Sequence, residues 1–133
     1  MSDLYIDEVI DMSLYSNKDI ILKEKINIKN IKESLADLVA LGNKKGGLII
    51  IGASYDNVLG LSNNQILSIK TELINLINNY IYPNLSYQFD IVNLKSKFLL
   101  MININESLSK PLVLNIDNES LIYISAIKNS PMA

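Results

Sequence analysis

The 133-residue sequence contains no cysteine, histidine or tryptophan, and all twelve basic residues are lysines because arginine is also absent. Without cysteine there are no disulfides, thiolate zinc sites or cysteine nucleophiles. Without histidine the usual general base at neutral pH is missing. Lysine can neutralise a phosphate, but it cannot form the bidentate contact with which arginine reads guanine. Any catalysis therefore depends on Asp, Glu, Lys, Ser, Thr or Tyr.

Long apolar runs are missing as well. Runs such as Leu48 to Ile51 are much shorter than the roughly 20 residues that a transmembrane helix needs, and no segment resembles a signal peptide. About half of the residues are apolar, with a hydrophobic fraction of 49%, which is enough for a core in a chain of this length. We therefore expect one soluble, cytoplasmic domain over residues 1–133, without membrane contact. Within it we expect an acidic, helical N-terminal segment (1–17) and a domain core (18–128).

The net charge is −2, but the charges are unevenly distributed. Residues 1–17 contain four acidic residues and no lysine, whereas residues 18–45 contain seven lysines and four acidic residues. A local basic patch is the electrostatic footprint of a polyanion partner. The alternative is a solvated helix face with ordinary lysines, and charge alone favours that alternative.

Apolar periodicity and turn residues predict an α+β fold with two main helices on a mixed, mostly antiparallel sheet. A short helix is expected at residues 4–14. Strands are expected at residues 20–26, 48–53, 58–61, 87–92, 97–104, 112–116 and 121–125.

Capping residues mark the ends of the two main helices. Asn30 and Ser62 each precede a Glu or Gln by three residues, which is the pattern of a capping box. The first helix should end in a left-handed cap supplied by Gly42 and Asn43. The second should end before Pro83, because proline cannot continue the helical hydrogen bonds.

The segment ALGNKKGGLIIIG, residues 40–52, joins the first helix to a strand that is apolar on both faces. Lys44 and Lys45 compensate the partial negative charge at the end of the helix. Gly46 and Gly47 allow a sharp turn with positive φ and a close backbone approach. The spacing matches neither a Walker motif nor a dinucleotide-binding fingerprint. The residues alone therefore predict a tight corner with exposed amides and two lysines.

This segment also resembles the Ala-Phe-Ala-Asn-Thr-x-Gly-Gly element of Schlafen-type AlbA-like domains. The resemblance covers residues 18–128 and includes elements in the same order along the chain. These elements are Val39–Ala53, the residues Asp56, Val58, Gly60 and Leu61, the helix end at Ile81-Tyr82-Pro83, Lys110-Pro111, and Tyr123-Ile124-Ser125.

The resemblance implies a nucleic-acid-binding domain, for RNA or DNA, within a transcriptional regulator or a defence system. It implies the following contacts to nucleic acid: Lys23, Lys25, Asn43, Lys44, Lys45, Gly46, Gly47 and Lys110. Lysine contacts to phosphates position a nucleic acid without reading its sequence, so affinity should fall steeply with salt. A degenerate module for protein interaction or homo-oligomerisation is the alternative, in which residues 43–47 are only a corner.

In the Schlafen branch the resemblance also implies a metal-dependent endoribonuclease that acts on tRNA-like RNA. Its two early glutamates and a later aspartate hold Mg²⁺ or Mn²⁺, which activates water. Aligned on Lys23, this sequence has Ile21 where a glutamate is expected. A second register supplies Asp19, Glu24 and Asp56 as catalytic and metal-binding residues.

The alternative to a metal site is a purely structural interpretation, in which Asp19 and Glu24 lie on a solvated strand edge and Asp56 forms a turn. Ser125 also replaces the arginine of the family's last strand. We therefore expect a binding domain without a cofactor, and Mg²⁺ or Mn²⁺ only if the protein is a nuclease.

Overall fold

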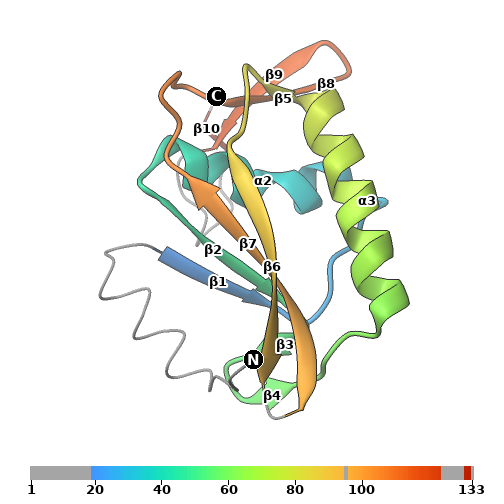
Figure 1. Ribbon diagram of the computed structural model, residues 1–133. Helices are drawn as coiled ribbons and strands as arrows, with labels where there is room; N and C mark the ends of the chain where they lie inside the picture. Colours follow the sequence, from blue (N-terminus) through green and yellow to red (C-terminus); the bar gives the residue numbers. More distant parts are fainter. Residues whose placement is uncertain (1–18, 95, 124–130, 133) are drawn as a thin grey trace.

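The computed structural model describes residues 19–94, 96–123 and 131–132. The helix predicted at residues 4–14 and the position of Ser125 lie outside these residues. The described elements form the predicted α+β fold, with helices α2 (Ile31–Asn43) and α3 (Asn63–Tyr80) (Figure 1). Neither of these helices is long and apolar enough to cross a membrane.

The first sheet has the strand order β1-β2-β7-β6. Its strands are β1 (Asp19–Lys23), β2 (Gly46–Ile51), β7 (Lys97–Asn105) and β6 (Tyr87–Leu94). β1 is parallel to β2, whereas β2–β7 and β7–β6 are antiparallel. One end of this sheet therefore contains the beginnings of β1 and β2 and the end of β7. There Asp19 lies opposite Gly47, and Asn105 lies opposite Gly46.

The second sheet is antiparallel throughout and has the order β10-β9-β8-β5. Its strands are β10 (Pro131–Met132), β9 (Glu119–Tyr123), β8 (Val113–Ile116) and β5 (Ile81–Tyr82). A separate hairpin consists of β3 (Ala53–Ser54) and β4 (Asn57–Val58). The mostly antiparallel strands of the prediction are thus confirmed, but they form two four-stranded sheets and a hairpin in place of one sheet. The strand expected at residues 58–61 is shorter, ending at Val58.

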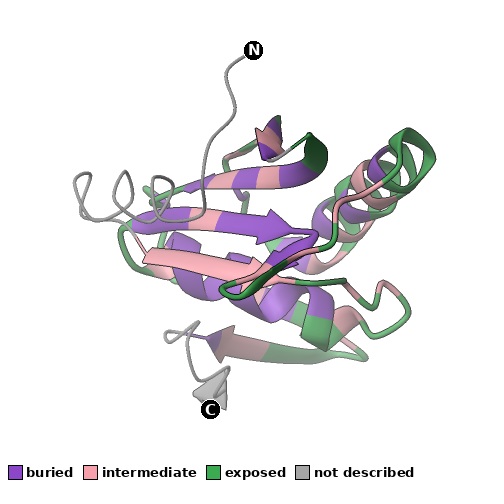
Figure 2. Ribbon diagram, turned by 90° about the horizontal axis from the view of Figure 1, so that it is seen from below, coloured by how far each residue is buried: buried purple, intermediate pink, exposed green. Residues whose placement is uncertain are grey.

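Helix α2 lies between the two sheets and also contacts α3. Its residues 34–42 are all buried, as expected for a helix with neighbours on every side. The main core joins aliphatic side chains of α2 to those of β2, β7, α3 and the second sheet. Helix α3 buries only one side (Figure 2).

The predicted helix starts are confirmed. The Asn30 side chain accepts a hydrogen bond from the amide of Glu33 at 3.0 Å. Ser62 and Gln65 form a reciprocal capping box, with bonds of 3.1 Å and 2.8 Å. Helix α3 ends at Tyr80, before Pro83, as predicted.

The predicted left-handed cap of the first helix is wrong. Gly42 and Asn43 both belong to α2, and the left-handed backbone comes at Gly46, with φ of 82°. Gly42 has a packing role instead, because a Cβ there would lie 2.5 Å from Cδ1 of Leu112. The glycine allows α2 to approach the second sheet closely.

Candidate functional site

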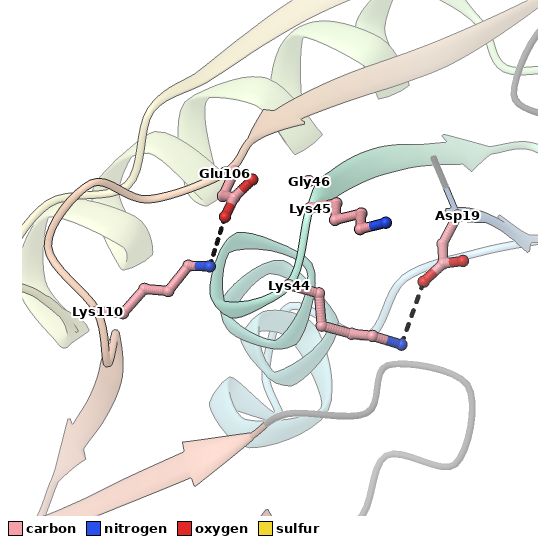
Figure 3. Close-up of a pocket in the computed structure, with 6 residues that line it drawn as sticks. All are labelled: Asp19, Lys44, Lys45, Gly46, Glu106 and Lys110. Atoms are coloured by element: carbon pink, nitrogen blue, oxygen red, sulfur yellow. Dashed lines mark hydrogen bonds and ion pairs between the residues drawn. The ribbon is translucent and has the colours of Figure 1, made fainter. Parts of the chain in front are cut away.

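A recess of about 510 Å³ opens at the sheet edge where β1 and β2 begin and β7 ends (Figure 3). We call it the lysine recess, and its lining consists of Asp19, Lys44, Lys45, Gly46, Glu106 and Lys110. It brings together four of the eight predicted nucleic-acid contacts, from segments about sixty residues apart in sequence. The other four lie outside its lining.

A hydrogen bond holds the loop after β7 against the end of α2, and a second one lies within that loop. The amide of Ser107 donates to the carbonyl of Gly42 at 2.8 Å, so the loop after β7 is tied to the last turn of α2. The amide of Ser109 donates to the hydroxyl of Ser107 at 3.1 Å. The recess therefore has a lining that the fold itself positions.

Two of the three lysines in the recess are paired with carboxylates. Lys44 lies 3.5 Å from Asp19, and Lys110 lies 2.6 Å from Glu106. The hydrogen bond and the charge of Lys110, with a smaller effect of Lys45, lower the pKa of Glu106. Among the described residues, Lys45 has no carboxylate within ion-pair distance.

Three lysines and two carboxylates leave the lining of the recess with a net charge of +1. Both ion pairs are well exposed to solvent, and such pairs contribute about 0–1 kcal/mol. An incoming phosphate can therefore compete with the carboxylates for the ammonium groups. Glu106 is a member of the site that sequence reasoning missed, since no local pattern indicates that its loop meets the end of α2.

Asn43 has a structural role rather than a position in the recess. Its amide nitrogen donates to the carbonyls of Leu112 and Tyr123, each at 3.0 Å, and its side-chain oxygen accepts from the amide of Leu112 at 2.6 Å. These bonds fasten the end of α2 to the second sheet. The fold therefore explains this asparagine without a ligand.

Gly46 and Gly47 are buried members of β2, so the expectation that this corner exposes them is wrong. A Cβ on Gly46 would collide with the carbonyl oxygen of Ile104, and one on Gly47 would lie 2.7 Å from the carbonyl oxygen of Asp19. Close packing of β2 between β1 and β7 therefore requires both glycines. Gly46 still lines the recess with its backbone.

Lys23 and Lys25 both lie outside the lysine recess. Lys23 pairs with Asp37 of α2 at 2.7 Å, and its side chain is only 18% exposed, against 2% for Asp37. Burial raises the pKa of Asp37, and the hydrogen bond and charge of Lys23 partly offset that effect. Lys23 thus compensates a buried carboxylate, whereas Lys25 is exposed beside a separate surface pocket.

The three candidate metal ligands do not come together. Asp19 begins β1 and Glu24 follows its last residue, so their Cα atoms are about 16 Å apart along an extended strand. Asp56 lies in the β3–β4 turn, where its carboxylate accepts from the Ser54 hydroxyl at 2.9 Å. Within the described ranges, no group of three or more acidic side chains could hold a metal ion. The three candidate ligands therefore do not fit the Mg²⁺ or Mn²⁺ centre that a nuclease would need.

The sequence matches the model of a known protein family. The sequence model described as "Schlafen, AlbA_2" matches residues 17–130. No curated protein matches.

Solved structures that share the fold include the following two. The N-terminal domain of an ATP-dependent DNA helicase RecG-related protein from Nitrosomonas europaea aligns with a TM-score of 0.59 and 16% identity, over 86% of this chain and 82% of that domain. The DIP2311 protein from Corynebacterium diphtheriae aligns with a TM-score of 0.52 and 13% identity, over 86% of this chain and 22% of its own length. The chain thus spans about a fifth of that second protein.

Proposed function

Since the chain belongs to the Schlafen AlbA_2 family, we propose that it is a nucleic-acid-binding domain whose lysine recess contacts phosphates. The observation that carries this proposal is the convergence of Lys44, Lys45 and Lys110 on one recess, from two segments that the hydrogen bond between Ser107 and Gly42 joins. The helicase-related name of one protein with this fold supports a nucleic-acid context. We propose a place in a regulator or defence system on the family resemblance alone.

The recess suits phosphates better than base edges. Ammonium groups are point charges that neutralise phosphate oxygens, and the lining offers no arginine fork for a guanine. Lys45, which has no carboxylate within ion-pair distance among the described residues, is the primary phosphate anchor. Lys44 and Lys110 join it as their exposed ion pairs open. The interaction is therefore salt-dependent and has little base specificity.

The test is fluorescence anisotropy with labelled RNA and DNA, comparing the wild type with the double variant Lys44→Glu/Lys45→Glu. We expect this variant to lose at least about tenfold in affinity, because it reverses two charges at the phosphate site. The matched control is Lys29→Glu/Lys32→Glu, which makes the same change in net charge at the other end of α2. We expect the control to bind nucleic acid with an affinity much closer to that of the wild type.

Each other outcome has a definite meaning. Equal losses in both double variants would show that net charge matters and that the lysine recess does not. Absence of binding at low salt would contradict the proposal and favour a protein-interaction module. Parallel reactions with Mn²⁺, examined on a gel, test the nuclease alternative, since metal-dependent shortening of the RNA would require a metal site despite the separation of Asp19, Glu24 and Asp56.

A further inference from the structure

Leu108 is fully exposed in the loop that follows β7. A single exposed leucine is ordinary on a protein surface. This one differs from a leucine on a loosely held loop, because Ser107 and Ser109 on either side of it are both held by hydrogen bonds. The fold therefore holds an apolar side chain out in solvent.

Leu108 lies beside the lysine recess. Its neighbours two residues away on either side, Glu106 and Lys110, both line the recess and pair with each other at 2.6 Å. Consecutive Cα atoms are about 3.8 Å apart, so the Cα of Leu108 lies within about 8 Å of those of both residues. An exposed apolar side chain therefore belongs to the same short loop segment as two of the residues that line the recess.

We propose that Leu108 packs against an unstacked nucleobase while the lysine recess binds a neighbouring phosphate, so that the site takes single-stranded nucleic acid in preference to duplex. This inference rests on the proposed function. A single strand offers phosphates and apolar base faces next to each other, which is the combination that this loop presents. In a duplex the base faces are covered by stacking, and the ammonium groups alone would make contact.

The charge of the recess limits how many phosphates it holds. Asp19 and Glu106 lie within the lining and repel phosphate oxygens, and the net charge of the lining is only +1. A long run of phosphates would have to pass these carboxylates. A short contact that gains affinity from a base fits this balance better than an extended electrostatic track.

The experiment measures affinity for single-stranded RNA, single-stranded DNA and the corresponding duplexes over a range of salt concentrations. The test variant is Leu108→Ser, and the matched control is Leu67→Ser, which changes another exposed leucine, on α3. We expect Leu108→Ser to bind single strands roughly fivefold more weakly, as expected for loss of a partly buried apolar contact. Leu67→Ser should bind like the wild type, and the two single strands report whether a ribose hydroxyl contributes.

The salt dependence separates the base contact from the phosphate contacts. Leu108→Ser should leave the slope of log K against log salt unchanged, because a neutral side chain releases no counterions. Lys45→Gln should reduce that slope by about 0.7 for a single strand.

Three results would overturn the inference. Unchanged affinity in Leu108→Ser, with binding that still depends on the lysines, would remove the base contact and leave the proposed function intact. Duplex binding as tight as single-strand binding would do the same. If the wild type self-associates and Leu108→Ser is monomeric in size-exclusion chromatography, Leu108 is a protein contact and not a base contact.

Discussion

At the scale of single residues, Asn43 is the clearest case of a motif residue whose role is to stabilise the fold. Its side chain makes three hydrogen bonds to backbone groups of Leu112 and Tyr123, which are 69 and 80 residues away in sequence. Because the residue begins the Asn-x-x-Gly-Gly part of the family element, at residues 43–47, its position in the sequence suggests a ligand contact. The geometry instead makes it the fastening between α2 and the second sheet.

Asn43→Ala should therefore reduce the free energy of unfolding by about 2–4 kcal/mol, since three hydrogen bonds are lost and backbone groups are left unpaired. Urea denaturation followed by circular dichroism measures the change. The control is Asn75→Ala, an exposed asparagine within α3, which should be neutral or slightly stabilising because alanine favours the helix. Equal stability of the two variants would contradict the structural role.

Lys23 also has a structural role, because its ammonium group compensates the buried carboxylate of Asp37. Lys23→Met should lower the free energy of unfolding by roughly 2–4 kcal/mol by leaving that charge without its cation. Lys25→Met, two residues away and exposed, should change stability by less than about 0.5 kcal/mol. If Lys23→Met instead weakens nucleic-acid binding and leaves the urea midpoint unchanged, Lys23 is a phosphate contact after all.

At the scale of elements, local signals predicted most of the secondary structure. The helix starts at Asn30 and Ser62 follow from side chains that bond to amides three residues away, so a short stretch of sequence contains the necessary information. The turn between the strands expected at residues 112–116 and 121–125 is equally local, since Asp117 and Asn118 there both adopt positive φ. The prediction for the end of α2 is wrong because Gly42 and Asn43 pack against and bond to Leu112, the residue before β8, and no local pattern indicates this contact.

The same distinction applies to the candidate site. Lys44, Lys45 and Lys110 could be named from the sequence, but their convergence depends on β7 ending beside the start of β2. The pairing of Lys23 with Asp37 and the separation of Asp19 from Glu24 also follow from the path of the strands. Sequence alone therefore identified candidate residues better than it sorted ligand contacts from structural ones.

The capping box of α3 allows a test of how much a local helix cap contributes to stability. Ser62→Ala removes the hydroxyl that accepts from Gln65 and should cost about 1 kcal/mol of stability. Ser68→Ala, at an exposed position within the same helix, should be neutral or slightly stabilising. Urea midpoints of the two variants provide the comparison, and a loss in Ser68→Ala as large as in Ser62→Ala would argue against the cap.

At the scale of the whole molecule, the buried Asp37 links global stability to pH. Burial raises the pKa of its carboxyl above the ordinary value of 3.8, so the folded protein holds this proton more tightly than the unfolded chain does. The stabilisation from this group is therefore complete below about pH 3.8 and is lost as the pH rises through the raised pKa.

We accordingly expect the stability advantage of the wild type over Asp37→Asn to shrink as the pH rises from about 4 to about 7. Urea denaturation of both proteins at several pH values gives this difference, in which the other titrating groups largely cancel. An advantage that grows with pH would mean that the Lys23 ion pair outweighs the cost of burial.

We propose that the lysine recess is where this domain contacts nucleic acid, and an amide NMR titration with a single-stranded oligonucleotide at low salt can locate that contact. We expect the largest shifts at residues 44–46 and 106–110, which form the two loops of the recess. The proposal is contradicted if the shifts concentrate around residues 27–32, where Lys29 and Lys32 flank a different surface pocket. It is contradicted equally if no amide shifts at all in excess oligonucleotide.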